Sequence, residues 1–405
     1  MRRVSWSLLV LFVFAIPWEH SLDAGAPFGN VARVLGVLTL LVAIPAVLFE
    51  GRFRRLSAMH WVMLGSYLWV CCTFFWTAAP HETVLRIRAY AQEMILVWLI
   101  WEFVSKAEQL QVLFRTWLAG SWVLAILTVG GFAFSNGLVQ EQVRFAAIGQ
   151  DPNDVARLLA FGFPIALLLF NSSNSRLERT LCLMYFPAGF AATLLTASRS
   201  GLLLSIVALG GCGIAGLRWH SRSIIVAAAS VVFAAIGISV VAPNGTLDRL
   251  RTAAEMKEYG DLNQRVNIWS EGWRAFETAP LVGHGAGSFV IAAKVAPEDT
   301  AHNTVLSILV EGGLCWLLMA MAIVVFAFRA ISKGPARLRF GLILLMVLWA
   351  SSSLTQSLWE SRTTWLLIGI AVVSERIAQE SVPKVGSDYP SPVPSYEAPR
   401  APSLV

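Results

Sequence analysis

Long apolar runs separated by short polar stretches dominate the chain, and they set the expected fold. A helix needs about 20 mainly apolar residues to cross a bilayer. Twelve segments approach that length: 4–18, 31–49, 59–76, 86–104, 112–134, 154–170, 180–197, 200–217, 222–241, 302–328, 338–356 and 362–378. The pattern predicts an all-α integral membrane protein with about twelve transmembrane helices, in which residues 1–380 form one polytopic membrane domain.

Two longer polar stretches depart from this pattern. The first, about 242–301, contains a segment with helical spacing near 262–278, which Asn263 could cap and Pro280 ends, so one large partly helical loop is expected. The second, 381–405, is rich in Pro and Ser and has no periodicity. Such composition predicts a disordered tail without a catalytic role.

The positive charges predict which loops share a side of the membrane. Lys and Arg gather in alternate loops, at Arg2, Arg3, Arg52, Arg54, Arg55, Lys106, Arg176, Arg179, Arg218, Arg222, Arg329, Lys333, Arg337 and Arg339. Because cytoplasmic loops carry the excess of Lys and Arg, both termini are expected in the cytoplasm and the 242–301 loop outside.

Composition supports the membrane interpretation and excludes other classes. The chain is 56% hydrophobic and 14% charged, whereas soluble domains carry about 25% charged residues. Its net charge of +6 comes from basic residues dispersed singly, so nucleic-acid binding is not expected. The five cysteines lie inside apolar runs without metal-ligand spacing and are expected to be small buried side chains.

The ionisable groups are almost absent from the centres of the runs. They gather toward the ends predicted to face outward, at Arg86, Arg88, Glu93, Arg144, Asp151, Asp154, Arg157, Arg199, Arg265, Arg274, Glu360 and Arg362. A transporter would be expected to carry charge near mid-membrane, along its substrate path. The pattern instead predicts a site for an anionic amphiphile at the outer interface.

The large loop holds the candidate chemistry. Arg265, Trp269 and Gly272 share one helix face, although an interfacial helix with Trp at headgroup depth would look the same. The glycines at 283, 285 and 287 lack the strand and helix that flank a phosphate loop, so a chain reversal explains them.

His302 is the candidate general base. If Asp299 or Thr300 caps a helix that begins near Ala301, His302 lies in its first turn, where the helix dipole disfavours the imidazolium. A neutral imidazole can accept a proton near pH 7. The alternative is a polar residue that only marks the end of a membrane helix.

Metal and serine-hydrolase chemistry have little support. Asp151 and Asp154 are explained by a helix start, with Asp151 as the cap and Pro152 at the first position, so no metal site is predicted. Ser198 and Ser200 flank Arg199 without the G-x-S-x-G pattern of hydrolases.

Four groups of residues together resemble one family. They are Arg144-Phe145 with Gly149-x-Asp151-Pro152-Asn153, then Thr196-Ala197-Ser198-Arg199-Ser200-Gly201, then Arg265-x-x-Ile268-Trp269, and finally Gly283-x-Gly285-x-Gly287 leading to His302-Asn303-x-x-Leu306 and Glu311-Gly312-Gly313. In this order and on this topology they resemble the O-antigen ligase / O-antigen polymerase superfamily of bacterial polysaccharide-assembly enzymes.

The resemblance implies an inverting, metal-independent glycosyltransferase without a cofactor. It would transfer glycan from undecaprenyl diphosphate to an acceptor hydroxyl at the periplasmic face of the inner membrane. His302 would be the base, and Arg199 and Arg265 would bind the diphosphate. The further candidates for substrate binding are Arg144, Asn153, Asn303, Trp269 and Arg274.

The acceptor stays open at this point. A ligase that uses lipid A-core comes first and a polymerase that joins repeat units comes second. A protein O-oligosaccharyltransferase and a transporter without chemistry are further alternatives. In every case membrane lipid surrounds the chain.

Overall fold

A computed structural model describes residues 1–22, 25, 29–51, 53–134, 144–217, 221–241, 248, 265–297 and 299–381. Every secondary-structure element in these residues is helical, so the predicted all-α class is confirmed. The predicted cap Asn263 and all but the first residue of the predicted 381–405 tail lie outside the described residues.

Each of the twelve predicted runs forms a helix. They are α1 (Arg2–Ala15, continued by the 3-10 helix η1, Ile16–Trp18), α2 (Val31–Glu50), α3 (Ala58–Thr73), α4 (Pro80–Phe103), α5 (Ala107–Phe134), α6 (Pro152–Ser172), α7 (Arg176–Leu195), α8 (Arg199–Leu217), α9 (Ser221–Val241), α13 (Thr304–Lys333), α14 (Ala336–Ser353) and α15 (Arg362–Ser381). Five of them, α2, α5, α6, α13 and α14, are long and apolar enough to cross a membrane. The chain is therefore a helical membrane protein, and the count of twelve crossings stays a prediction.

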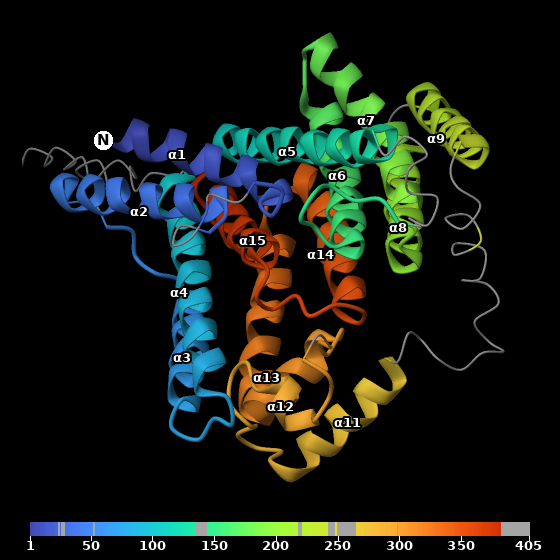
Figure 1. Ribbon diagram of the computed structural model, residues 1–405. Helices are drawn as coiled ribbons and strands as arrows, with labels where there is room; N and C mark the ends of the chain where they lie inside the picture. The colour runs from blue at the N-terminus through green and yellow to red at the C-terminus, as the bar shows by residue number, and fades with distance from the viewer. Residues whose placement is uncertain are drawn as a thin grey trace, which may run out of the picture.

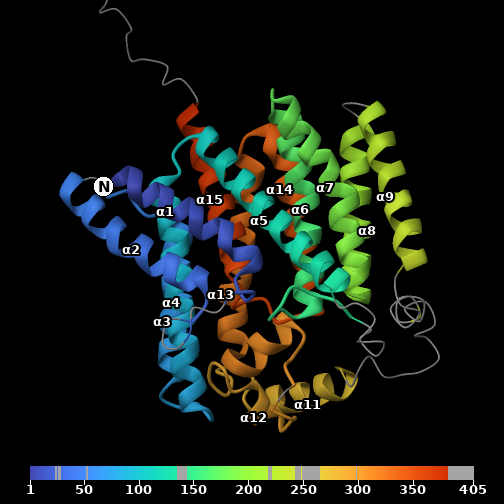
Figure 2. The same ribbon diagram turned by 45° about the horizontal axis from the view of Figure 1, so that its top comes forward.

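The described part of the large loop is partly helical, as predicted. It contains α11 (Arg265–Thr278) and the short α12 (Phe289–Ala293). Figures 1 and 2 both show these two helices at one end of the molecule, against α13. A small apolar cluster joins the three helices and is separate from the main core; it includes Ile268, Ala275, Phe289, Leu306 and Val310.

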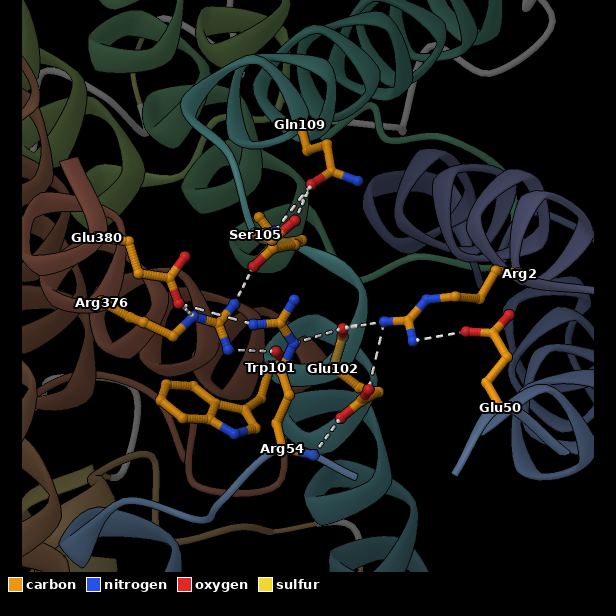
Figure 3. Close-up of polar contacts among 10 residues, drawn as sticks. Arg2, Glu50, Arg54, Trp101, Glu102, Ser105, Gln109, Arg376 and Glu380 are labelled. Carbon is orange, nitrogen blue, oxygen red and sulfur yellow. Dashed lines mark hydrogen bonds and ion pairs between the residues drawn. The ribbon is translucent and has the colours of Figure 1, made fainter. Parts of the chain in front are cut away.

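Polar contacts at another end of the bundle join segments that were predicted to be cytoplasmic (Figure 3). The carbonyl oxygen of Glu102, in the last turn of α4, accepts hydrogen bonds from Arg2 (3.0 Å) and Arg54 (3.1 Å). Arg376 of α15 donates to the carbonyl oxygens of Trp101 and Val104. Cationic side chains thus satisfy the free carbonyls where α4 ends.

A second set of contacts joins segments that were predicted to face outward. The His284 carbonyl bonds the amide of Ala78, Asn303 bonds the Leu354 carbonyl, and Arg144 bonds Asn153. The two sets correspond to the two sides that alternating crossings would create. The identity of each side stays a prediction.

Candidate active site

Helix α13 is interrupted at Gly313, and the loop that follows α11 enters the gap. Gly313 has φ 68° and ψ −168°, outside the helical region. The amides of Leu314 and Cys315 would normally bond four residues back. Here they donate to the carbonyl oxygens of Pro280 (2.9 Å) and Leu281 (3.2 Å).

The same loop satisfies the carbonyls that the break releases. The amides of His284 and Gly285 donate to the carbonyl oxygens of Val310 and Glu311, both at 2.8 Å. Backbone that breaks within a membrane helix needs such replacement partners, because lipid offers none. The loop therefore stabilises the break, and the break fixes the loop.

The glycines of this loop are required by close approach. Gly283 and Gly285 have φ of +67° and +101°, which L side chains rarely adopt. A Cβ at Gly283 would lie 2.5 Å from the Glu311 carbonyl oxygen, and one at Gly285 would lie 2.3 Å from Thr77 Oγ1. The predicted chain reversal is confirmed.

Helix α11 rests on α12 and α13 through a narrow contact at Gly272. Ile268, Gly272 and Ala275 are its buried residues. A Cβ at Gly272 would lie 3.0 Å from Leu306 Cδ2, so the two helices approach closely there. Arg265 and Trp269, on the same face as predicted, are half-buried.

Two hydrogen bonds flank His302 and hold its backbone. Trp269 Nε1 donates to the Ala301 carbonyl oxygen (2.9 Å), and Asn303 Oδ1 accepts from the amide of Leu306 (3.0 Å). Between them His302 adopts φ 44°, a left-handed conformation in which His is one of the enriched non-glycine residues. Trp269 and Asn303 therefore both position His302.

The predicted start of this helix was wrong. Helix α13 begins at Thr304, with Asn303 as its N-cap, so His302 precedes the helix instead of lying in its first turn. Asn is among the strongest N-caps, and its side chain takes the role expected of Asp299 or Thr300.

Even so, the environment of His302 favours the neutral imidazole. Burial lowers the pKa of His302, and the positive charge of Arg265 lowers it further. The carboxylates of Asp151, Asp299 and Asp154 oppose this shift. The cause therefore differs from the predicted helix dipole, but the predicted consequence is the same: a histidine able to accept a proton near neutral pH.

A hydrogen-bonded frame positions Arg199 at the start of α8. Asn153 Oδ1 accepts from Ser198 Oγ (2.8 Å) and from Arg144 Nη2 (2.9 Å). Arg144 Nε also donates to the Thr196 carbonyl oxygen (3.2 Å). Arg144 and Asn153 thus tie the turn before α8 to the start of α6.

The start of α6 is itself as predicted. Asp151 is its N-cap and accepts from the amide of Asn153 at 2.7 Å, and Pro152 occupies the first position. A Cβ at Gly201 would lie 2.2 Å from the Cβ of Ala156, so α8 and α6 touch directly beside Arg199.

The two guanidinium groups expected to bind an anion lie close enough to affect each other. Burial lowers the pKa of Arg265, the charge of Asp151 raises it, and the charge of Arg199 lowers it. The structure therefore brings His302, Asp151 and Arg199 within electrostatic range of Arg265. A pair of neighbouring cations beside helix starts is suited to an anion with several oxygens.

Arg274 does not join this group. It lies on α11, its side chain is 71% exposed, and its Nη1 pairs with Glu271 at 2.5 Å. The described residues contain no group of three or more His, Cys, Asp or Glu side chains that could hold a metal ion.

A cleft of about 200 Å³ lies between α6, α8 and α14 next to this group. Asn153 and Ser200 line it, and Leu203, Leu204 and Val207 of α8 extend the lining along the helix. The cleft could not be predicted, because apolar runs do not show which helices pair. The sequence marks Asp154 and Asp299 as helix-start residues and does not predict their electrostatic action on His302.

Two comparisons with known proteins bear on this arrangement. Residues 184–317 match the family model described as O-antigen ligase, a stretch that contains Arg199, Arg265 and His302. The chain is also 23% identical over 343 residues to the exopolysaccharide production protein ExoQ of Rhizobium meliloti (strain 1021), covering 73% of this chain and 76% of that protein. Both matches support the O-antigen ligase/polymerase superfamily. The superfamily predicted from the motifs is confirmed, and with it a membrane enzyme of the ligase/polymerase type.

Proposed function

We propose that this protein transfers glycan from undecaprenyl diphosphate to the hydroxyl of an acceptor sugar at the periplasmic face of the bacterial inner membrane. The observation that carries the proposal is the convergence of a half-buried histidine of lowered pKa with two arginines whose charges interact. Both termini would lie in the cytoplasm.

In the proposed step, His302 accepts the proton of the acceptor hydroxyl as its oxygen attacks the anomeric carbon. The bond from that carbon to the diphosphate oxygen breaks, and the electron pair leaves with undecaprenyl diphosphate. Attack from the face opposite the leaving group inverts the anomeric centre. No metal or cofactor takes part in this proposal.

Arg199 and Arg265 would bind the diphosphate and stabilise the charge that grows on it. Arginine binds phosphate oxygens through two parallel hydrogen bonds and keeps its charge when partly buried. Donors that are already in place lower the barrier, and the loss of one such donor typically costs about 100- to 1000-fold in turnover.

The cleft between α8 and α14 supports a lipid-linked donor. It joins a polar mouth, at Asn153 and Ser200, to an apolar wall along α8. A diphosphate at the mouth would leave its isoprenoid chain against Leu203, Leu204 and Val207. The proposal therefore assigns the lipid to this cleft.

Two acceptors are compatible with this chemistry. A ligase would use lipid A-core, and a polymerase would use a second lipid-linked glycan. The ligase is the first candidate. The polymerase is the second, and the name of the relative ExoQ, which refers to exopolysaccharide production, supports it.

The test is a transfer assay with purified protein in detergent, undecaprenyl-diphosphate glycan, an acceptor and a chelator. The wild type should form the glycan–acceptor product, and His302→Ala should reduce turnover about 100-fold or more. Offering lipid A-core and lipid-linked glycan separately distinguishes ligase from polymerase.

The same preparation in vesicles tests the transporter alternative. Movement of the lipid-linked glycan across the bilayer without cleavage of the sugar–phosphate bond would contradict the proposed function. Transfer that disappears with the chelator would contradict only its metal independence.

A further inference from the structure

A cavity of about 270 Å³ lies beside the candidate active site, between η1, α4, α6 and the α14–α15 connection. A water molecule occupies roughly 30 Å³ in the liquid, so the cavity can hold a small polar ligand. The side chains of its wall that matter here are Glu93, Gln150, Asp154 and Arg157.

Two of these side chains are almost fully buried but incompletely hydrogen-bonded. Glu93 is 3% exposed and Arg157 is 5% exposed. Oε2 of Glu93, and Nε and Nη1 of Arg157, have no hydrogen-bond partner among the described residues, whereas Arg157 Nη2 donates to Asp154 at 2.9 Å. Buried polar atoms without partners cost free energy, so native structures seldom keep them without a reason.

Gln150 contributes a third group of the same kind. Its Nε2 donates to the Pro17 carbonyl oxygen (3.3 Å) and to Ser21 Oγ (3.2 Å), while its Oε1 has no partner among the described residues. The wall therefore offers two acceptors, Glu93 and Gln150, and one strong donor, Arg157.

This set of groups selects the chemistry of the ligand. A free anion would be repelled by the Asp154 carboxylate, and a free cation by the Arg157 guanidinium. A hydroxyl both donates and accepts, so a ring that carries several hydroxyl groups can satisfy all three side chains at once.

The cavity also lies where a substrate sugar would be needed. Asp154 lines it, and the charge of Asp154 acts on His302. Arg157 lines both this cavity and the α8–α14 cleft, so one side chain separates the two spaces.

We infer that this cavity binds one sugar ring of the glycan substrate, with Glu93 and Gln150 accepting hydrogen bonds from its hydroxyl groups and Arg157 donating to them. The inference rests on the proposed function. The ring belongs either to the donor glycan or to the acceptor, which present the same chemistry to the cavity.

The experiment measures KM separately for lipid-linked donor and for acceptor in Glu93→Gln. The substitution preserves the shape of the side chain but replaces one carboxyl oxygen with an NH₂ group, which donates and cannot accept a hydrogen bond. One of the two KM values should rise about fivefold, as the loss of a buried hydrogen bond predicts, while kcat changes less. A rise in the donor KM assigns the ring to the donor, and a rise in the acceptor KM assigns it to the acceptor.

Arg157→Lys provides a second, independent variant, which keeps the positive charge beside Asp154 and loses the fork of the guanidinium. Its effect should fall on the same KM. If Glu93→Gln fails to fold, this variant alone decides the outcome.

Glu102→Gln is the matched control, because Glu102 is a fully buried glutamate of the same helix that pairs with Arg2 away from the cavity. It should leave both KM values unchanged. If folded Glu93→Gln or Arg157→Lys has the KM values of the wild type, the cavity does not bind a sugar ring. An equal rise of KM in Glu102→Gln would contradict the inference in the same way. Neither result would contradict the proposed function. A wild type that transfers no glycan would instead contradict the proposed function.

Discussion

At the scale of single residues, the reactivity of His302 depends on its burial and on the charges around it. Burial and the charge of Arg265 lower the pKa of the imidazole, whereas Asp151, Asp299 and Asp154 raise it. Because only the neutral imidazole can accept a proton, a lowered pKa extends activity to more acidic pH. The acid limb of the kcat/KM profile should therefore lie below pH 6.5, the approximate pKa of an unperturbed histidine.

Replacing Arg265 with Gln should move this acid limb to higher pH, because the substitution removes a charge that disfavours the imidazolium. It should also lower kcat, since one donor to the diphosphate is lost. The measurement is the pH dependence of kcat/KM in both proteins. Arg274→Gln, on the exposed face of the same helix, should leave the position of the limb unchanged. An unshifted limb in Arg265→Gln would show that the two groups are not coupled.

At the scale of elements, the break in α13 and the loop inserted into it act as one unit. Gly283→Ala should lower thermal stability, because an L residue at φ +67° is strained and its Cβ would meet the Glu311 carbonyl. The strain alone is worth about 1–3 kcal/mol. Gly210→Ala is the control: nothing lies within 4 Å of a Cβ at that position of α8. Its unfolding midpoint in detergent should stay unchanged or rise slightly, and an equally stable Gly283→Ala would contradict the tight fit of the loop.

The cleft between α8 and α14 gives a second prediction at this scale. Val207→Trp should fill the cleft and raise the KM for donors with a long isoprenoid chain more than for donors with a short one. Ile206→Trp introduces the same side chain at the preceding residue, which is 53% exposed and does not line the cleft. Transfer assays with both donors should show chain-length discrimination only in Val207→Trp. Equal effects of the two variants would remove the lipid from this cleft.

The helices also show which parts of the fold can be predicted from the sequence alone. Apolar runs predicted every helix of the bundle, because the bilayer demands long segments whose backbone bonds internally. The motifs located His302, Arg199 and Arg265. The start of α13 was misplaced by three residues, because Asp299, Thr300 and Asn303 are all acceptable caps and only the contacts of Trp269 and Leu354 distinguish them. The cavity at Glu93 and Arg157 depends on helices far apart in the sequence, which periodicity cannot bring together.

At the scale of the whole molecule, polar contacts divide the chain into two ends. At one end, Arg2, Arg54 and Arg376 bond carbonyl oxygens at the end of α4. The second set of contacts joins the segments near His302. Twelve alternating crossings would place these sets on opposite sides of the membrane. If one of the helices between two segments of the same set did not cross, those two segments would lie on opposite sides of the membrane. Segments joined by direct hydrogen bonds cannot lie on opposite sides.

Cysteine labelling tests this arrangement. In a variant whose five native cysteines are replaced, Thr300→Cys and Gln379→Cys each introduce one exposed thiol, near His302 and in the last turn of α15. A membrane-impermeant maleimide should label Thr300→Cys in intact spheroplasts and Gln379→Cys only after permeabilisation. The cysteine-free parent should stay unlabelled in both conditions. Labelling of both thiols before permeabilisation would place the two ends on one side, and the proposed chemistry would then lack the separation of cytoplasm and periplasm on which it depends.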